Sequence, residues 1–325
     1  MAAVKPLKPA YIDLYVSYGH APSGITIRGR VLEGTRPTLG TAATTWLGRL
    51  RTTWKLAETD ELPDVEVRVE LLPSSGPPRE LIVRTDKEGF FRARFEGSVN
   101  AESVRSRATL RSERFVTEPV EAPALIHPET AGIAVISDID DTVLLSNVKN
   151  RFALLKRVLF ATPEDLETFK GAAALYQRLV GAGAPLVFVS SSPWNLEPRL
   201  RAFLQLRGFP VAPMLLKDLG IGPEADPVKD HLGYKTRMVT EVLGNLPARR
   251  FLLIGDSGER DPEIYGGIAR AHPERVAAIL IHRVTQEPKD SPRFEGMFVF
   301  DRYDDAAVEL ERRGLLAAIR AQPAT

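Results

Sequence analysis

Three aspartates lie within four positions of one another, directly after an apolar run of the sequence. The run covers residues 133–137, and Asp138, Asp140 and Asp141 follow it. Carboxylates that are brought together at the end of a buried strand repel one another, so such a cluster needs a compensating cation or a catalytic role. The alternative, an acidic turn or helix cap in solvent, suits one or two of these aspartates. The cluster therefore predicts acid chemistry supported by a divalent cation.

Polar residues also follow two later apolar runs. Ser190 and Ser191 open a hydroxyl-rich turn before a helical pattern, where hydroxyls and free backbone amides can bind a phosphate. Asp256 and Asp261 lie in another acidic loop, and oxygen ligands from two loops favour a hard cation such as Mg²⁺ over zinc. Lys235 opens a further helical pattern and can point to the same centre, although the alternative is an ordinary solvated lysine.

The strands and helices that hold these residues can be predicted from the hydropathy pattern in the second half of the chain. Six apolar runs alternate there with helical stretches, at residues 133–137, 185–190, 211–216, 251–254, 276–281 and 297–300. Such alternation is typical of crossover units and predicts an α/β fold with a doubly wound, mostly parallel sheet. Ligands bind outside the carboxyl ends of the strands in this architecture, and the polar residues named above lie at such ends. We assign this domain to residues 127–325.

The first half of the chain has the pattern of an antiparallel sheet. Apolar and polar residues alternate with period two through most of residues 11–125, which predicts a small antiparallel β-sandwich. Residues 38–56 carry apolar side chains at helical spacing and predict one inserted helix, whose tryptophans we assign to the core rather than to a ligand site. Residues 121–130 contain two prolines and no periodicity, as expected for a linker. We assign the sandwich domain to residues 1–126.

Composition excludes several classes of protein. The 325 residues include 43 basic and 42 acidic side chains, and the net charge of +1 lacks the basic excess of a nucleic-acid binder. The absence of cysteine excludes disulfides, thiolate zinc sites and a cysteine nucleophile. No window approaches the roughly 20 apolar residues of a membrane span, and the start lacks the apolar stretch of a signal peptide. We expect a cytoplasmic protein that does not bind nucleic acid.

The residues at the strand ends carry a resemblance to a known superfamily. The chain resembles the haloacid dehalogenase superfamily of phosphotransferases in four ordered motifs, which are Asp138-x-Asp140-x-Thr142, Ser190, Lys235 and Asp256-x-x-x-x-Asp261. Within that superfamily it is similar to the Mg²⁺-dependent phosphatidate phosphatases of the actin-patch-protein type in the strings SDIDDTVLLSNV, VSSSPWNL, LLKDLG and GDSGERDPEIY. The resemblance covers residues 133–300, and the preceding β-domain is similar to that of bacterial relatives. It implies a haloacid dehalogenase-like fold for the second domain.

The resemblance also implies a two-step hydrolysis. Asp138 is expected to attack phosphorus and form an aspartyl-phosphate, while Asp140 acts first as general acid and then as general base. Mg²⁺ is expected to bind Asp138, the main-chain carbonyl of Asp140 and Asp256. The expected reaction converts phosphatidate to diacylglycerol and phosphate.

The remaining motif residues are expected to bind the substrate or to support the site. Ser190, Ser191 and Lys235 are expected to bind the non-bridging phosphate oxygens, where the lysine also compensates charge that builds in the transition state. Asp261 is expected to orient water ligands or Lys235, and Thr142 to fix its loop.

Two features favour a lipid among phosphomonoester substrates. About 45 residues separate the first two motifs, which is too few for a large cap domain and suits an open site. Residues 149–160 alternate basic and apolar side chains, and as a helix they could lie in a lipid headgroup layer and give peripheral membrane contact. The other interpretation of this segment is an ordinary amphipathic helix packed on the sheet.

Three other functions stay open. The same chemistry could act on a non-lipid phosphoester. The chain could instead be a non-catalytic binding module with a degenerate second domain, which the intact motif residues oppose. A receiver-like domain that is itself phosphorylated on Asp138 would hold a stable acyl-phosphate, and the general acid Asp140 makes turnover the better prediction.

Overall fold

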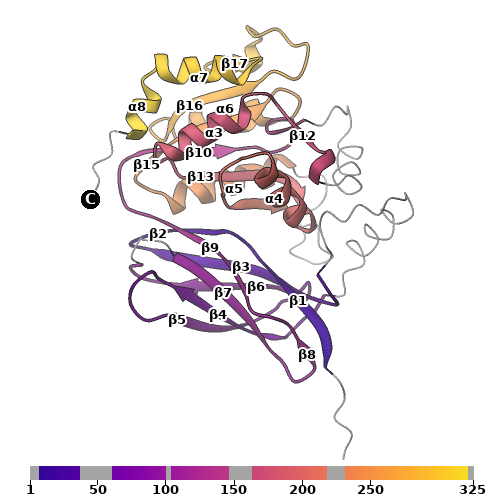
Figure 1. Cartoon of the computed structure of the whole chain (residues 1–325). Coiled ribbons are helices and arrows are strands. Elements are labelled where there is room, and N and C mark those ends of the chain that lie inside the picture. Colours follow the sequence, from indigo (N-terminus) through magenta and orange to yellow (C-terminus); the bar gives the residue numbers. More distant parts are fainter. Residues whose placement is uncertain (1–6, 37–60, 100–103, 146–162, 218–230, 321–325) are drawn as a thin grey trace, which may run out of the picture. The chain divides into compact units, whose positions relative to one another are not determined.

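Figure 1 shows the computed structural model of the chain, which describes residues 7–36, 61–99, 104–145, 163–217 and 231–320. The chain divides into two compact units, Met1–Glu129 and Thr130–Thr325. The first unit thus ends at residue 129, whereas the sequence pattern places the boundary at residue 126. The expected helix over residues 38–56 and the basic segment at residues 149–160 lie outside the described residues.

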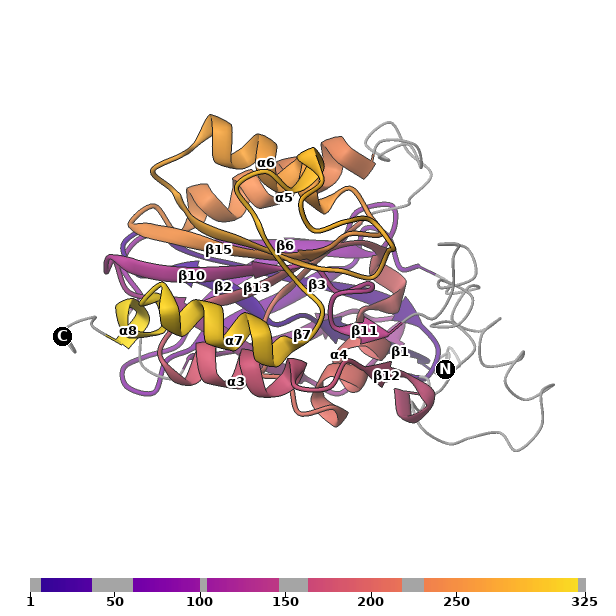
Figure 2. The same ribbon diagram turned by 90° about the horizontal axis from the view of Figure 1, so that it is seen from above.

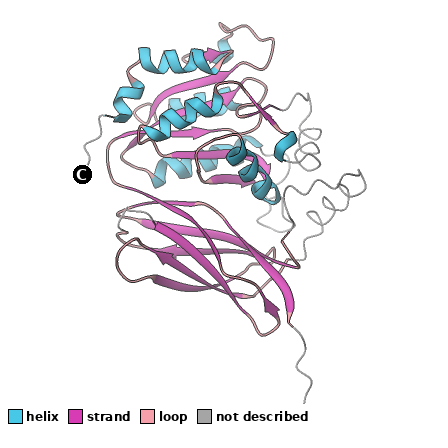
Figure 3. Cartoon of the chain, viewed as in Figure 1, coloured by secondary structure: helices cyan, strands magenta, loops and turns pink. Residues whose placement is uncertain are grey.

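The first unit is built from β-strands joined in one continuous sheet. Its strands are β1 (Lys8–Leu14), β2 (Ser17–His20), β3 (Gly24–Glu33), β4 (Glu66–Leu72), β5 (Arg79–Arg84), β6 (Phe90–Phe95), β7 (Val104–Arg111), β8 (Phe115–Val116) and β9 (Val120–His127). Their order is β5-β4-β7-β9-β2-β3-β1-β8, with β6 paired to β3, and most neighbours are antiparallel. Figure 3 shows this unit as strands and loops through its described part.

Buried and exposed side chains alternate along several strands of the first unit and show which face of the sheet packs on its core. On β4, Val67, Val69 and Leu71 are buried while the residues between them are partly exposed, because successive side chains of a strand point to opposite faces. Strands β5 and β6 contact each other although each pairs with a different neighbour. The sheet therefore folds over one apolar core, which confirms the antiparallel β-domain expected from the period of two.

The second unit contains a six-stranded parallel sheet. Its main elements are β10 (Gly132–Ser137), α3 (Ala172–Gly181), β13 (Leu186–Pro193), α4 (Glu197–Leu206), β14 (Met214–Lys217), α5 (His231–Asn245), β15 (Arg249–Asp256), α6 (Asp261–Ala271), β16 (Val276–His282), β17 (Phe298–Phe300), α7 (Tyr303–Arg312) and α8 (Leu315–Arg320). A small hairpin, β11 (Leu144–Leu145) with β12 (Glu167–Thr168), and three short 3₁₀ helices, η1 (Pro163–Asp165), η2 (Trp194–Leu196) and η3 (Pro292–Phe294), complete it.

The topology of this sheet confirms the doubly wound α/β fold. The strand order is β14-β13-β10-β15-β16-β17, and the neighbours pair in parallel. Figure 2 shows α5 and α6 on one face of the sheet and α3, α7 and α8 on the other. The chain runs outward from β10 in one direction first and then continues from β15 in the other, so the strand order reverses between β10 and β15. Ligands bind at such a switch point, outside the carboxyl ends of the strands.

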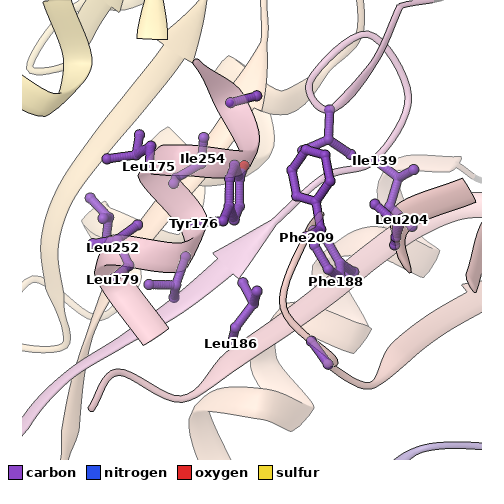
Figure 4. Close-up of a cluster of buried hydrophobic side chains, with 14 of the residues drawn as sticks. Ile139, Leu175, Tyr176, Leu179, Leu186, Phe188, Leu204, Phe209, Leu252 and Ile254 are labelled. Atoms are coloured by element: carbon purple, nitrogen blue, oxygen red, sulfur yellow. The ribbon is translucent and has the colours of Figure 1, made fainter. Parts of the chain in front are cut away.

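A large apolar cluster packs between α3 and the face of the sheet that α3 covers. Figure 4 shows Leu175, Tyr176 and Leu179 of α3 packed beside side chains of the sheet, among them Phe188 and Ile254. All five side chains are at most 2% exposed. Interiors packed this closely resist deformation, so the loops at the strand ends start from a rigid base.

The helices of the described residues are short. The longest, α5, has 15 residues. Within the described ranges, none is both long and apolar enough to cross a membrane.

Candidate active site

The first acidic loop, residues 138–142, begins at the carboxyl end of β10 in the middle of the sheet. The side chain of Asp138 is fully buried, and its backbone N–H donates a hydrogen bond to the carbonyl of Ile254 on β15 at 2.9 Å. The loop then turns tightly, because Asp141 has a φ of 54° and donates its N–H to the carbonyl of Leu144 at 3.0 Å. A positive φ is uncommon outside glycine, and aspartate is one of the residues that adopt it most readily. The backbone thus presents Asp138 and Asp140 at the switch point of the sheet.

The second acidic loop, residues 256–261, follows β15, the neighbour of β10. Oδ1 of Asp256 accepts hydrogen bonds from the backbone N–H groups of Gly258 at 2.6 Å and Glu259 at 3.0 Å. Oδ2 of Asp261 accepts a hydrogen bond from the backbone N–H of Asp256 at 3.2 Å. Both aspartates are fully buried. The loop therefore folds around its own carboxylates, directly beside the first acidic loop.

Lys235, in the first turns of α5, joins the two loops. Its Nζ lies 2.9 Å from Oδ1 of Asp138 and 3.7 Å from Oε2 of Glu259, and it donates a short hydrogen bond to Oδ1 of Asp261. The lysine side chain is only 2% exposed. Burial by itself lowers the pKa of Lys235, but the surrounding carboxylates, Asp138 first, hold it well above its usual value. The lysine is thus a permanent positive charge inside an acidic cluster.

The same cluster fits a divalent cation. Carboxylate oxygens of Asp138, Asp256 and Glu259 all lie within 4.8 Å of one another. Among the described residues, none donates a hydrogen bond to the buried Oδ2 atoms of Asp138 and Asp256. Burial raises the pKa of both aspartates well above the usual value, since their charged forms lose solvation, while Lys235 opposes the rise. The buried Oδ2 atoms of Asp138 and Asp256 are therefore suitable ligands for a hard cation such as Mg²⁺ or Ca²⁺.

The hydroxyl-rich turn of β13 contacts Asp140. The hydroxyls of Ser190 and Ser192 each donate a hydrogen bond to Oδ2 of Asp140 at 2.8 Å, and the backbone N–H of Ser192 donates to Oγ of Ser190 at 2.9 Å. Oγ of Ser191 is buried and has no hydrogen-bond partner in the described part of the chain. The single hydroxyl proton of Ser190 is therefore directed to the acid, and not to a phosphate, in this structure.

The structure brings the residues singled out in the sequence into two groups. Asp138, Lys235, Asp256 and Asp261 form the acidic cluster with its lysine, and Asp140 with Ser190 forms the second group. The carbonyl of Thr142 accepts a short hydrogen bond from the hydroxyl of Tyr303. Its own Oγ1 is buried, without a hydrogen bond to the residues described.

Sequence reasoning missed two residues of the site, Glu259 and Ser192. Both lie inside segments that the motifs had marked, since Glu259 is part of the second acidic loop and Ser192 ends the run of three serines. Which carboxylate of a loop faces Asp138, and which serine faces Asp140, depends on the turn of the backbone. The motifs therefore predicted the segments that contain these two residues, but not which side chains they contact.

The second unit has a doubly wound α/β fold whose acidic and hydroxyl side chains gather at the carboxyl ends of β10, β13 and β15. Within it, residues 133–283 match the family model described as the catalytic domain of phosphatidate phosphatase APP1. This match covers the two acidic loops, the hydroxyl-rich turn of β13 and Lys235.

Two curated proteins are similar to this chain in sequence. An uncharacterized protein of Schizosaccharomyces pombe is 27% identical over 217 residues, which cover 64% of this chain and 35% of that protein. Phosphatidate phosphatase APP1 of Saccharomyces cerevisiae is 25% identical over 236 residues, which cover 71% of this chain and 40% of that protein. The chain thus spans less than half the length of either curated relative. A solved hydrolase of the haloacid dehalogenase family from Deinococcus radiodurans R1 is 19% identical over 57% of this chain and 98% of its own, with a TM-score of 0.36, from which we infer nothing further.

Proposed function

We propose that this chain is a Mg²⁺-dependent phosphomonoester hydrolase that converts phosphatidate to diacylglycerol and phosphate through an aspartyl-phosphate. The environment of Asp138 is the observation that carries the proposal. Its carboxylate is buried at the end of the central strand and lies 2.9 Å from the ammonium of Lys235, which stabilises the ionised, nucleophilic form. The match to the APP1 catalytic domain supports phosphatidate as the substrate.

Asp138 and Asp140 divide the chemistry between them. In the first half-reaction a carboxylate oxygen of Asp138 bonds to phosphorus, the bond from phosphorus to the diacylglycerol oxygen breaks, and Asp140 gives that oxygen a proton. In the second, Asp140 takes a proton from the water that attacks phosphorus, and phosphate leaves Asp138. The hydrogen bonds from Ser190 and Ser192 hold Asp140 in one orientation for both proton transfers.

Other side chains bind the phosphoryl group. Lys235 carries three N–H donors beside Asp138 and can direct one of them to a non-bridging oxygen, while Asp261 keeps it in place. The buried hydroxyl of Ser191 can donate to a second oxygen. Ser190 can do the same only if its hydroxyl turns away from Asp140.

Asp138, Asp256 and the main-chain carbonyl of Asp140 would hold Mg²⁺. The convergence of carboxylate oxygens within 4.8 Å supports this assignment. The bound cation would neutralise charge between an anionic nucleophile and an anionic phosphate.

The test of the proposed function compares two classes of substrate. Phosphate release is measured from phosphatidate in mixed detergent micelles and from a soluble phosphomonoester at equal phosphate concentration, with Asp138→Asn as the blank. We expect release that favours the lipid. Release from the soluble ester alone would leave the aspartate chemistry intact and contradict the lipid substrate, and release from neither would contradict the function.

Removal of divalent cations is expected to stop the reaction. EDTA should reduce phosphate release to the level of the blank, and excess Mg²⁺ added after dialysis should restore it, because carboxylates without a cation repel the phosphate. The same micelle assay measures both steps. A rate that stays unchanged in EDTA would contradict the dependence on Mg²⁺.

Gly255→Ala is expected to lower the rate about 100-fold, as misplacement of catalytic groups by about 1 Å does. A Cβ atom at residue 255 would lie 2.2 Å from Oδ2 of Asp261, so Asp261 and with it Lys235 have to move. The matched control is Gly244→Ala in α5, where an added Cβ has no described atom within 4 Å. Steady-state rates and melting temperatures of both variants provide the measurement. Wild-type activity in Gly255→Ala would show that the position of Asp261 is unimportant.

A further inference from the structure

Arg293 contacts the outer side of the second acidic loop. Arg293 belongs to η3, beyond the end of the APP1 match at residue 283. Its Nη1 donates to the carbonyl of Ser257 at 2.7 Å, and its Nη2 donates a short hydrogen bond to the carbonyl of Glu259. These two carbonyls lie on either side of Gly258. Arg293 therefore binds the loop backbone both before and after Gly258.

The remaining N–H groups of Arg293 bind two carboxylates. Nε and Nη2 form a bidentate pair with Glu263 of α6 at 2.8 and 3.1 Å, and Nη1 reaches Oε2 of Glu287 at 3.1 Å. The five N–H donors of the guanidinium thus all have acceptors. Because all five donors are bound, the guanidinium is held in one orientation. It therefore also fixes the backbone of the second acidic loop to which it donates.

The contacts on the inner side of the loop depend on this backbone. Because the carbonyl of Ser257 and the N–H of Gly258 belong to one planar peptide, the carbonyl bound by Arg293 turns this N–H toward Oδ1 of Asp256, to which it donates. The N–H of Glu259 donates to the same oxygen. Oδ2 of Asp256 is left without a hydrogen bond from the described residues, in the cluster where carboxylate oxygens of Asp138, Asp256 and Glu259 lie within 4.8 Å of one another. The same turn brings the carboxylate of Glu259 to the cluster, where its side chain is 12% exposed.

Four carboxylates and one lysine meet in this cluster. Asp138, Asp256 and Glu259 contribute three carboxylates, and Asp261 adds a fourth beside Lys235, whose single positive charge lies 3.7 Å from Glu259 and closer to Asp138. Four carboxylates beside one buried lysine are costly, and further positive charge stabilises their ionised forms. A divalent cation bound by oxygens of the three carboxylates would provide it.

We propose that Glu259 is a third carboxylate ligand of the cation site and that Arg293 is the positioning residue that brings it there. The proposal rests on the proposed function, because it concerns the cation on which that function depends. It adds a protein ligand from the second acidic loop and assigns a role to a residue outside the matched catalytic segment.

Binding of Mg²⁺ to the full chain, measured by titration calorimetry without substrate, tests the proposal. Glu259→Gln keeps the shape of the side chain and removes its charge, and Arg293→Lys keeps the charge and loses the fork of donors. The matched control is Arg275→Lys, because Arg275 also binds backbone carbonyls, those of Leu243 in α5, Leu246 just after it and Arg249 at the start of β15. Melting temperatures are recorded for all variants.

We expect Glu259→Gln and Arg293→Lys to raise the Kd for Mg²⁺ roughly tenfold or more, as changes around a metal site commonly do. Arg275→Lys should lower the melting temperature about as much as Arg293→Lys and leave the Kd within about twofold, because it binds residues at the end of α5 and the start of β15, whereas the cluster lies at the opposite end of β15. An unchanged Kd in Glu259→Gln would overturn the ligand role even if Arg293→Lys fails to fold. Equal changes of Kd in the two arginine variants would overturn the positioning role. Absence of Mg²⁺ binding in the wild-type chain would instead contradict the proposed function itself.

Discussion

Asp138→Asn is expected to abolish phosphate release, with a loss of roughly 10⁴-fold or more, as removal of a catalytic nucleophile does in other hydrolases. The amide has the shape of the carboxylate but no charged oxygen that could attack phosphorus. The variant should fold, because burial raises the pKa of Asp138 well above its usual value and a neutral side chain removes that cost of desolvation. Phosphate release from phosphatidate micelles measures the rate.

The melting temperature and circular dichroism of Asp138→Asn provide the control. We expect an unchanged spectrum and a melting temperature equal to or above that of the wild type, so that lost activity reports on chemistry and not on folding. A variant that folds and turns over at the wild-type rate would exclude Asp138 as the nucleophile.

Lys235→Met is expected to lose both stability and activity. Removal of the lysine leaves the buried carboxylates of Asp138 and Asp261 uncompensated, and breaking a buried pair in this way costs about 3–5 kcal/mol. Activity should fall roughly 10²–10³-fold, the range for loss of one preorganised donor to a developing negative charge. Calorimetric unfolding and the micelle assay measure the two effects.

The stability of Lys235→Met should depend on pH in a defined direction. Burial raises the pKa of Asp138 and Asp256, so the folded variant binds more protons than the unfolded chain above the ordinary carboxyl pKa of about 4. Its free energy of unfolding therefore falls as the pH rises through that range. We expect the variant to be closest to the wild type near pH 5 and farthest from it near pH 8.

Lys289→Met is the matched control for this lysine. Lys289 also forms an ion pair, with Asp301 at 2.7 Å, but its side chain is 45% exposed. Exposed pairs contribute at most about 1 kcal/mol, so the control should change stability little at any pH. A loss in Lys235→Met no larger than in Lys289→Met would contradict the account of the buried lysine.

The fold could be predicted largely because its signals are local. Buried parallel strands appear as short apolar runs, and the runs at residues 185–190 and 251–254 lie within or beside β13 and β15. Their ends differ by a few residues, since β15 extends from Arg249 to Asp256 and thus includes a carboxylate that the sequence pattern places in the loop. Polar residues can pair in a ladder as apolar ones do, so hydropathy alone does not mark where a strand ends.

The contacts of the site were less predictable because they depend on parts of the chain that are distant in sequence. Ser190 was expected at a phosphate, yet its hydroxyl donates to Asp140, 50 residues earlier in the chain. The guanidinium of Arg293 and the hydroxyl of Tyr303 reach the two acidic loops from segments in which no motif appears. Such contacts follow from how crossover units pack, and no spacing within a single motif encodes them.

Acid quenching during turnover tests the central claim most directly. Phosphatidate labelled in its phosphate is mixed with Mg²⁺ and the chain, the reaction is stopped in acid within milliseconds to seconds, and the labelled peptide is identified. Asp140→Asn is included because loss of the general base should slow hydrolysis of the intermediate and let it accumulate. We predict label on the peptide that contains Asp138, removable by hydroxylamine as an acyl-phosphate is, and none in Asp138→Asn. Steady release of phosphate from phosphatidate without label on that peptide, in the wild type and in Asp140→Asn alike, would contradict the aspartyl-phosphate mechanism.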